Sequence, residues 1–453
     1  MNPCAGNQAV NRKGAAHQMC IHGEENTNTR CHQPCRHNSA SMRRWALLWL
    51  ILAILAVFGM TFAKLRPEQN GPKRAARMLT AKIKNAETAA DLVEVVSKAV
   101  DRPVFDHIHL AATYAKLGAF QKMRQLPLSR MTRSVLVKLE RRLLQMLEKG
   151  QIDPQGLSNI LWAAAHLFVD APVLLKIVPA LSAQIPSKAS DMIAQHLSNS
   201  LWATVQLKEA VPEVLQIVPA LVAQVPVCAA DMTPQHVSNS LWAAAVLRDA
   251  APAVLQMVPY LVAQVPLQAG HMLPQALANS LWAAATLQDA SPDVLRMVPS
   301  IVAQIELKVD DMNPQDVSNI LWAAADLWTS TSVVLKVVPC VVAQVPFHAG
   351  DMIPQALSNS LYAATLLQTA SPKVLEIVPI LVTQLHLKMD QMSAQNLAYG
   401  LQAVIFFAER LRGLPIREPA IWASALARVK QILRRTHQHL VVGRQRKGVG
   451  NVW

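Results

Sequence analysis

Hydrophobic and polar positions recur with a 40-residue period between residues 152 and 391. In the third copy, Val237, Leu241 and Ala244 recur at helical spacing, and Pro252 opens a second apolar segment. No alternating pattern typical of strands competes with this one. The pattern therefore predicts two helices in each of six copies, or twelve helices in all.

A short motif marks the first helix of each copy. It reads Ser-Asn-Ile/Ser-Leu-Trp-Ala or a close variant, at 158–163, 198–203, 238–243, 278–283, 318–323 and 358–363. A repeat of this length cannot bury its apolar face alone, so successive copies must stack. We predict an all-α fold, a right- or left-handed α-solenoid, in a monomeric chain.

Two sets of prolines punctuate the second helix. The first set is expected to kink it at the same place in every copy, at Pro179, Pro219, Pro259, Pro299, Pro339 and Pro379. The second set is expected to end it, at Pro186, Pro226, Pro266 and Pro346. An equal kink in each copy keeps the copies superimposable.

The regions that flank the array are basic. We expect cap helices in 101–151, with His107–Leu117 and Ser129–Lys149 as the helical stretches, a degenerate cap in 392–435 and a flexible basic tail in 436–453. Residues 1–151 hold 24 Lys and Arg against 10 Asp and Glu, whereas the array 152–391 holds 9 against 17. The whole chain has a net charge of +14, but the array itself is acidic.

Residues 45–63 are 19 consecutive uncharged residues between pairs of cations. That length spans the hydrocarbon core of a bilayer, so we expect a transmembrane or signal-anchor helix. The following segment, 64–100, is interpreted either as a basic linker beside a membrane anchor or as a transit-like segment used after a signal. Both interpretations predict a membrane-associated or organellar protein, in a plastid or mitochondrion.

The leader 1–44 is polar and is expected to be disordered. It holds Cys20, Cys31 and Cys35 beside histidines, but their spacing fits no common zinc module, so no metal site is expected. The whole chain has 52% hydrophobic and 16% charged residues, a composition that excludes a largely disordered or collagen-like protein. We find no phosphate-binding loop, metalloprotease motif or nucleophile elbow, and expect no cofactor and no enzyme activity.

Two recurrent residues of the first helix have two interpretations each. The aromatic series (Trp162, Trp202, Trp242, Trp282, Trp322 and Tyr362) suits an inter-repeat core or a platform for nucleic-acid bases. The asparagine series (Asn159, Asn199, Asn239, Asn279, Asn319 and Asn359) suits a hydrogen-bonded ladder between repeats or contact with a ligand. Packing is favoured for both series, and ligand contact is the alternative.

The face opposite the apolar stripe is expected to carry His236, Asn239, Ala243 and Val246, with Trp242 at its margin. Two of these slots vary between copies, which would let residues such as His196, Gln206 and His236 select bases. Because the array is acidic, RNA phosphates would have to bind arginines of the caps. The expected phosphate contacts are Arg130, Arg133, Arg141, Arg142, Arg434 and Arg435.

The recurring Pro-Gln-x-Leu-Ser-Asn-Ser-Leu-Trp-Ala-Ala-Ala resembles the first helix of octotricopeptide repeats and of the related FAST-kinase-like, RAP-family helical repeat proteins. The resemblance covers 105–432, although no RAP domain follows. It implies an organellar factor that binds single-stranded RNA in RNA processing or stability. The alternative is a membrane-anchored protein-interaction scaffold that holds a helix or peptide in its groove.

Overall fold

The computed structural model describes residues 71–126 and 129–410. By its contacts the chain divides into units 1–69 and 70–453, and every described residue belongs to the second. The described residues form helices and no strands, so the predicted all-α class is confirmed. The leader, the apolar segment 45–63, Arg434, Arg435 and the basic tail lie outside the described residues.

Each repeat consists of a first helix, called A here, and a second segment, called B. The A helices are α6 (Pro154–Leu167), α8 (Ala194–Leu207), α10 (Pro234–Leu247), α12 (Pro274–Leu287), α14 (Pro314–Leu327) and α16 (Pro354–Leu367). The B helices are α7 (Val178–Lys188), α9 (Val218–Cys228), α11 (Val258–Gln268), α13 (Val298–Lys308), α15 (Val338–His348) and α17 (Val378–Lys388). These are the twelve predicted helices of the array, and a seventh A helix, α18 (Ala394–Arg410), follows them.

The prolines act differently from the prediction. Each B segment starts with a 3₁₀ turn, such as η5 (Pro252–Met257), and Pro259 then stands in the first turn of α11 instead of kinking a helix interior. Proline is tolerated there because the N–H groups of the first turn have no helical partner. Pro266 lies inside α11, which ends at Gln268, so the second set of prolines does not end the helix either.

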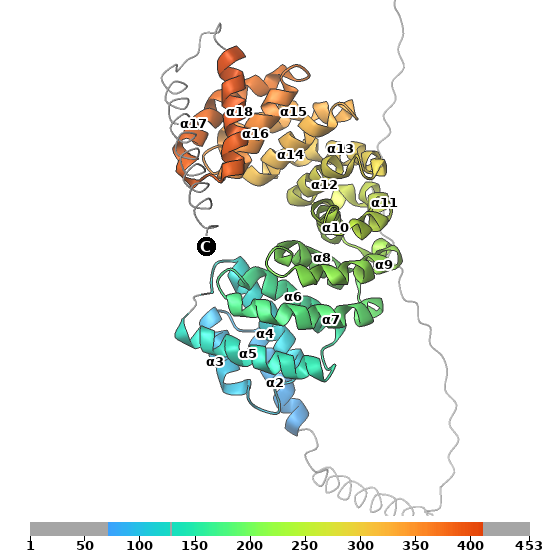
Figure 1. Cartoon of the computed structure of the whole chain (residues 1–453), viewed down its shortest axis with the longest axis vertical. Coiled ribbons are helices and arrows are strands. Elements are labelled where there is room, and N and C mark those ends of the chain that lie inside the picture. The colour runs from blue at the N-terminus through green and yellow to red at the C-terminus, as the bar shows by residue number, and fades with distance from the viewer. Residues whose placement is uncertain (1–70, 127–128, 411–453) are drawn as a thin grey trace, which may run out of the picture. The chain divides into compact units, whose positions relative to one another are not determined.

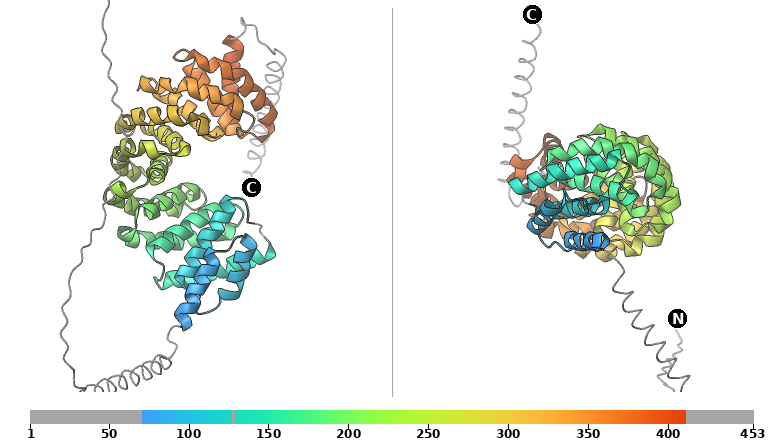
Figure 2. Two further views of the ribbon diagram at one scale, coloured as in Figure 1. Left: turned by 180° about the vertical axis from the view of Figure 1, so that it is seen from behind. Right: turned by 90° about the horizontal axis from the view of Figure 1, so that it is seen from below.

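The helices pack in sequence, each against its counterpart in the next repeat. A helices contact A helices, and each B helix contacts the 3₁₀ turn of the next B segment. The labelled helices follow one another along the stack in Figure 1, and the colours run in the same order in Figure 2. Leu241, Val254 and Leu261 of the third repeat are fully buried. Burying one such side chain contributes about 1.5–3 kcal/mol. This sequential packing is the pattern of an α-solenoid.

Hydrogen bonds to backbone carbonyls also join neighbouring repeats. Ser158 Oγ donates to the carbonyl of His196 at 2.9 Å, and Ser318 Oγ donates to that of Ala356 at 2.9 Å. On the B side, Lys308 Nζ donates to the carbonyls of Gly270 at 2.8 Å and Met272 at 2.7 Å, in the segment that joins the third repeat to the fourth. The lysine bonds satisfy carbonyls in the segment between α11 and α12, whereas the serine hydroxyls donate to carbonyls within the first turn of the next A helix.

In the described part of the chain, four helices precede the array: α2 (Gly71–Lys84), α3 (Ala89–Ala99), α4 (His107–Lys122) and α5 (Arg130–Glu148). The last two are the predicted cap helices. The prediction of a linker over 64–100 is wrong for the described part, because Ile83, Leu92 and Val96 are fully buried in the common core. The amphipathic spacing of these residues outweighs the basic composition that suggested a linker.

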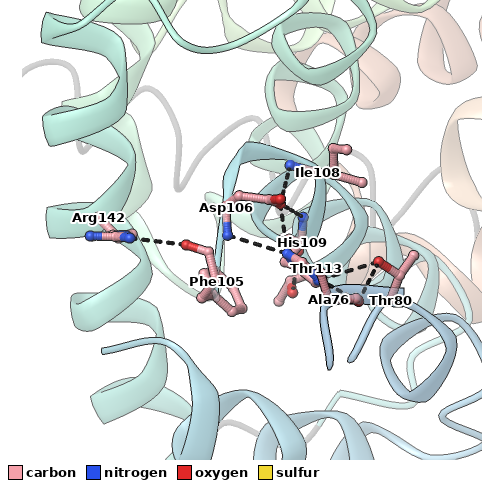
Figure 3. A network of polar contacts seen from close by, with 8 residues as sticks. All are labelled: Ala76, Thr80, Phe105, Asp106, Ile108, His109, Thr113 and Arg142. Atoms are coloured by element: carbon pink, nitrogen blue, oxygen red, sulfur yellow. Dashed lines mark hydrogen bonds and ion pairs between the residues drawn. The ribbon is translucent and has the colours of Figure 1, made fainter. Parts of the chain in front are cut away.

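A buried histidine of α4, His109, connects α4 to α2 by hydrogen bonds (Figure 3). His109, only 1% exposed, has Nδ1 2.6 Å from Asp106 Oδ1, and its Nε2 lies 2.9 Å from the carbonyl of Ala76 and 3.2 Å from Thr80 Oγ1. The acid, imidazole and hydroxyl are arranged in the order of a catalytic triad. The ring is nonetheless closed off from solvent and bound to the backbone of α2, so it holds α2 against α4.

Within the described residues, one segment is long and apolar enough to cross a membrane: Pro212–Asp231, with 39% of its most apolar window buried. It is the B segment of the second repeat. Val214, Ile217, Val218 and Leu221 are fully buried there against neighbouring helices. Its apolar character is therefore explained by the repeat core.

Candidate nucleic-acid interface

Each A helix turns a narrow stripe of side chains away from the core. In α6 this stripe is Gln155, Asn159, Trp162 and His166, and almost all other positions of the helix are buried. The spacing of four, three and four residues places the side chains on one line along the helix. We call the corresponding positions of all six repeats the A-face.

Three A-face slots are nearly constant and one varies. The glutamines are Gln155, Gln195, Gln235, Gln275, Gln315 and Gln355, and the asparagine and aromatic series are those given above. The variable slot holds His166, Gln206, Val246, Thr286, Asp326 and Leu366. The glutamine slot is missing from the expected ligand residues, although a Gln at the second position of every A helix was a visible signal.

The ligand face predicted from the sequence therefore differs from the A-face by one residue at two slots: it included His236 and Ala243 where the A-face has Gln235 and Trp242. Ala243 is fully buried, and His196 is 9% exposed. His236 closes a capping box with Thr233, where its Nδ1 accepts from the Thr233 N–H at 3.3 Å. Of the predicted pair of variable residues, only the second, such as Gln206, lies on the A-face. The first lies in the first turn of the A helix, where it is buried in five repeats and half-buried at His236, so the structure does not bring the predicted pair together on the A-face.

The A-face tryptophans are half-buried: they pack against the core and keep one edge exposed. Ring centroids are 6.5 Å apart for Trp162 and Trp202, and 5.9 Å apart for Trp282 and Trp322. Near the first end of the array, Gly118 of α4 makes room for this row, because a Cβ there would stand 2.8 Å from Trp162 Cζ3. The residues thus combine the two roles that the sequence left open, core packing and an exposed aromatic surface.

His166 lies between two tryptophans. Its ring centroid is 4.3 Å from that of Trp162 and 4.6 Å from that of Trp202, on which it stacks. Burial, reinforced by the nearby Lys122 ammonium, lowers the pKa of His166 from 6.5 to about 4. The imidazole is therefore neutral at physiological pH and belongs to the aromatic row.

The asparagines do not form the predicted ladder. In the described array their side chains make one hydrogen bond, in which Gln315 Nε2 donates to Asn319 Oδ1 at 2.8 Å within α14. The serines next to them, such as Ser158, make the bonds between repeats instead. The asparagine amides are half-exposed, so their donors and acceptors remain available to a ligand.

A pocket of about 420 Å³ opens between α10 and α12. Gln235 and Asn239 line it from one helix, and Gln275 and Asn279 from the next. The side chain of His271 lies at its rim. Four amides that converge on a pocket of this size can hold a flat polar group by paired hydrogen bonds.

Charge is sparse on the A-face and uneven beside it. Asp326 is the one acid at the A-face slots of the described array, and burial raises its pKa. Lys122 is the last residue of α4, and Lys208 and Arg248 directly follow α8 and α10. The acidic charge of the array therefore lies mainly in the loops and B segments, and the face itself is close to neutral.

The cap arginines predicted to bind phosphate lie on α5, which packs against the B side of the first repeat. Arg130, Arg133 and Arg141 are exposed. Arg142 is partly buried and donates to the carbonyl of Phe105 at 3.0 Å (Figure 3), so it supports the cap. Lys122, at the end of α4, lies nearer to the A-face than these arginines, because α4 packs directly on α6.

Among the described residues, no group of His, Cys, Asp and Glu is arranged to hold a metal ion. No protein-family model matches the chain, and no curated protein matches it.

Proposed function

We propose that this chain is a non-catalytic RNA-binding protein that holds single-stranded RNA along its A-face, with one base at each repeat. The observation that carries the proposal is the recurrence of a half-exposed aromatic ring beside two amides in each of the six repeats. Aromatic rings stack on unpaired bases, and amides pair with base edges. The variable slot between successive aromatic residues supplies the difference between repeats that a sequence preference requires.

Location in an organelle is part of the same proposal. It is supported by the apolar segment 45–63 and the basic stretch after it, and by the resemblance to organellar repeat proteins. In this role the protein would protect or position an RNA during its processing. The exposed Lys122 would contact a phosphate at the first repeat. Lys208, which is paired with Glu209, and Arg248, which is paired with Asp249 and donates to the Thr286 carbonyl, would contact phosphates by sharing or exchanging these partners.

A protein scaffold that binds an extended peptide is the second candidate. The observation that favours it is the constancy of the Asn and Gln slots, since identical amides suit a repeating peptide backbone. The two proposals differ in how the binding affinity depends on salt concentration. RNA affinity should fall with added salt, whereas the affinity of a neutral peptide should not, because such a peptide has no phosphates that release counterions.

The test is binding of fluorescent single-stranded RNA to the full-length chain at several salt concentrations. Replacing Trp242 with Leu keeps an apolar side chain but removes the stacking surface, and should weaken binding by about 1–3 kcal/mol. The matched control is Tyr260→Ala, which removes an aromatic ring that is 47% exposed on the B helix α11 and should leave affinity unchanged. Absence of RNA binding at low salt, or equal loss in both variants, would contradict the proposal.

A further inference from the structure

A row of exposed apolar side chains runs along the B helices. The penultimate residue of each B helix from the second repeat onward is a large apolar residue. We call this row the apolar ridge: Val227 (75% exposed), Leu267 (74%), Leu307 (76%), Phe347 (78%) and Leu387 (67%). The first repeat has Ser187 in the same slot. Single exposed apolar residues are ordinary, but a row repeated at a fixed position marks an interaction surface.

The ridge is not needed for packing between repeats. In the fourth repeat the residue two before it, Ile305, is fully buried, and the residue after it, Lys308, is bound to the carbonyls of Gly270 and Met272. Leu307 lies between these two anchored residues and is itself directed to solvent. The contacts of Ile305 and Lys308 therefore hold Leu307 pointing outward, although the Leu307 side chain itself takes no part in packing between repeats.

Acidic residues accompany the ridge. Asp191, Asp231, Asp311 and Asp351 stand four residues after the ridge slot of their repeats, at the start of the loop to the next A helix, and all four are exposed. In the described part of the chain, none of the four forms an ion pair. Three of the five ridge residues therefore have a carboxylate beside them, and His271 and Gln391 occupy the same slot after Leu267 and Leu387.

The spacing of the ridge selects the conformation of a partner. The A helices of successive repeats pack directly on one another and so lie about 8–10 Å apart, and ridge residues of successive repeats are spaced by about this repeat separation. Seven residues of an α-helix rise about 10.5 Å and return nearly to the same face. An extended strand advances about 3.3 Å per residue and alternates its faces, so its third residue would point away from the ridge.

We propose that the apolar ridge binds an amphipathic helix of a partner protein. The helix presents one apolar side chain per heptad to successive ridge residues, and Lys or Arg beside them to the aspartates. The charge of the carboxylates selects a basic helix and disfavours an acidic one. This surface lies on the B segments, so it is separate from the A-face and independent of the RNA proposal.

The probe is a synthetic helical peptide of about 30 residues with Leu once per heptad and Lys beside it, long enough at 1.5 Å per residue to reach four repeats. The full-length chain should bind it, with an affinity that falls at high salt because the carboxylates contribute. The combined variant Val227→Ser, Leu267→Ser, Leu307→Ser and Phe347→Ser should bind at least tenfold more weakly. Serine is the residue of the first repeat at this slot, so the variant should stay folded and keep its RNA affinity.

The matched control is Val169→Ser, which removes an apolar side chain that is 72% exposed next to the C-terminal end of α6, away from the ridge. It should leave peptide binding unchanged. The proposal is overturned if the serine variant binds the peptide as well as the native chain, or if a peptide with Glu in place of Lys binds equally. Concentration-dependent self-association that the serine variant abolishes would also overturn it, since the occupant would then be a second copy.

Discussion

Serine and asparagine, adjacent in every repeat except the fourth, have opposite surroundings. The Ser158 hydroxyl is buried and bonded to the next repeat, whereas Asn159 is half-exposed and directed outward. A second buried serine slot, represented by Ser240, has a hydroxyl with no hydrogen-bond partner among the described residues. Two serines that are alike in the sequence therefore differ in what they contribute to stability.

This difference gives a paired prediction. Ser158→Ala should lower the free energy of unfolding by about 0.5–1.5 kcal/mol, because it removes a hydrogen bond and leaves the His196 carbonyl without that donor. Ser240→Ala should be neutral or stabilising, because it removes a buried hydroxyl that has no partner. Urea unfolding of both variants measures the two values. Equal destabilisation would show that the assigned hydrogen bond is not what distinguishes the two serines.

His166 gives a prediction about pH. Its pKa is lowered to about 4 from an ordinary 6.5, so the folded state favours the neutral ring. The stabilisation is complete above pH 6.5 and is lost as the pH falls from 6.5 toward 4, where the unfolded chain binds the proton first. The native chain should therefore lose more stability over this window than His166→Asn does. Urea midpoints measured at both ends of the window provide the check.

A difference between the two chains that is independent of pH would contradict this assignment. The variant keeps a residual slope that sums two opposed contributions: the lowered pKa values of His196 and His236 act in the same direction as that of His166, and the raised pKa values of Asp316 and Asp326 act in the opposite direction.

At the scale of elements, the 40-residue period was sufficient to predict the helices but not their interior geometry. The positions of Leu241, Trp242 and Pro259 in each copy fix two apolar segments, and both form. The 3₁₀ turn before each B helix was not predicted, because a proline at the start of an α-helix and one at a kink leave the same local sequence. Only packing against the next repeat distinguishes these alternatives.

The A-face shows the same limit for the candidate site. The sequence identified the Asn and Trp slots, yet it placed Ala243 and His196 on the ligand side, where neighbouring A helices bury them. An A helix contacts helices on both sides as well as its own B helix, so only a stripe one residue wide stays open. That width depends on the contacts between repeats, which a single helix pattern does not contain.

The bonds from Lys308 to the Gly270 and Met272 carbonyls predict that this side chain stabilises the junction between the third and fourth repeats. Lys308→Leu should lower the free energy of unfolding by about 1–2 kcal/mol, because it removes two charge-assisted bonds to the third-to-fourth repeat junction. Lys308→Gln should lose about half as much, since Gln268 in the equivalent slot keeps one such bond, to the Met232 carbonyl at 2.8 Å. Thermal or urea unfolding compares them. Equal effects of the two substitutions would contradict this account.

At the scale of the whole molecule, charge and surface chemistry are separated. The described cap is basic, the loops and B segments of the array carry most of its acids, and the A-face between them is nearly neutral. RNA on the A-face would therefore derive its affinity from stacking and amide pairing more than from phosphates, with a shallow salt dependence. Each phosphate contact adds about 0.7 to the salt slope for a single strand, so a slope of about 2 would match three contacts, to Lys122, Lys208 and Arg248.

The most direct test of this account is to locate the RNA on the protein. Single-stranded RNA would be crosslinked by ultraviolet light to the full-length chain, and the modified peptides would be identified by mass spectrometry. The account predicts crosslinks at the aromatic A-face residues of successive repeats, Trp202, Trp242 and Trp282 among them. Crosslinks confined to the basic flanks 71–151 and 392–453, or none at all, would contradict the claim that the A-face binds RNA.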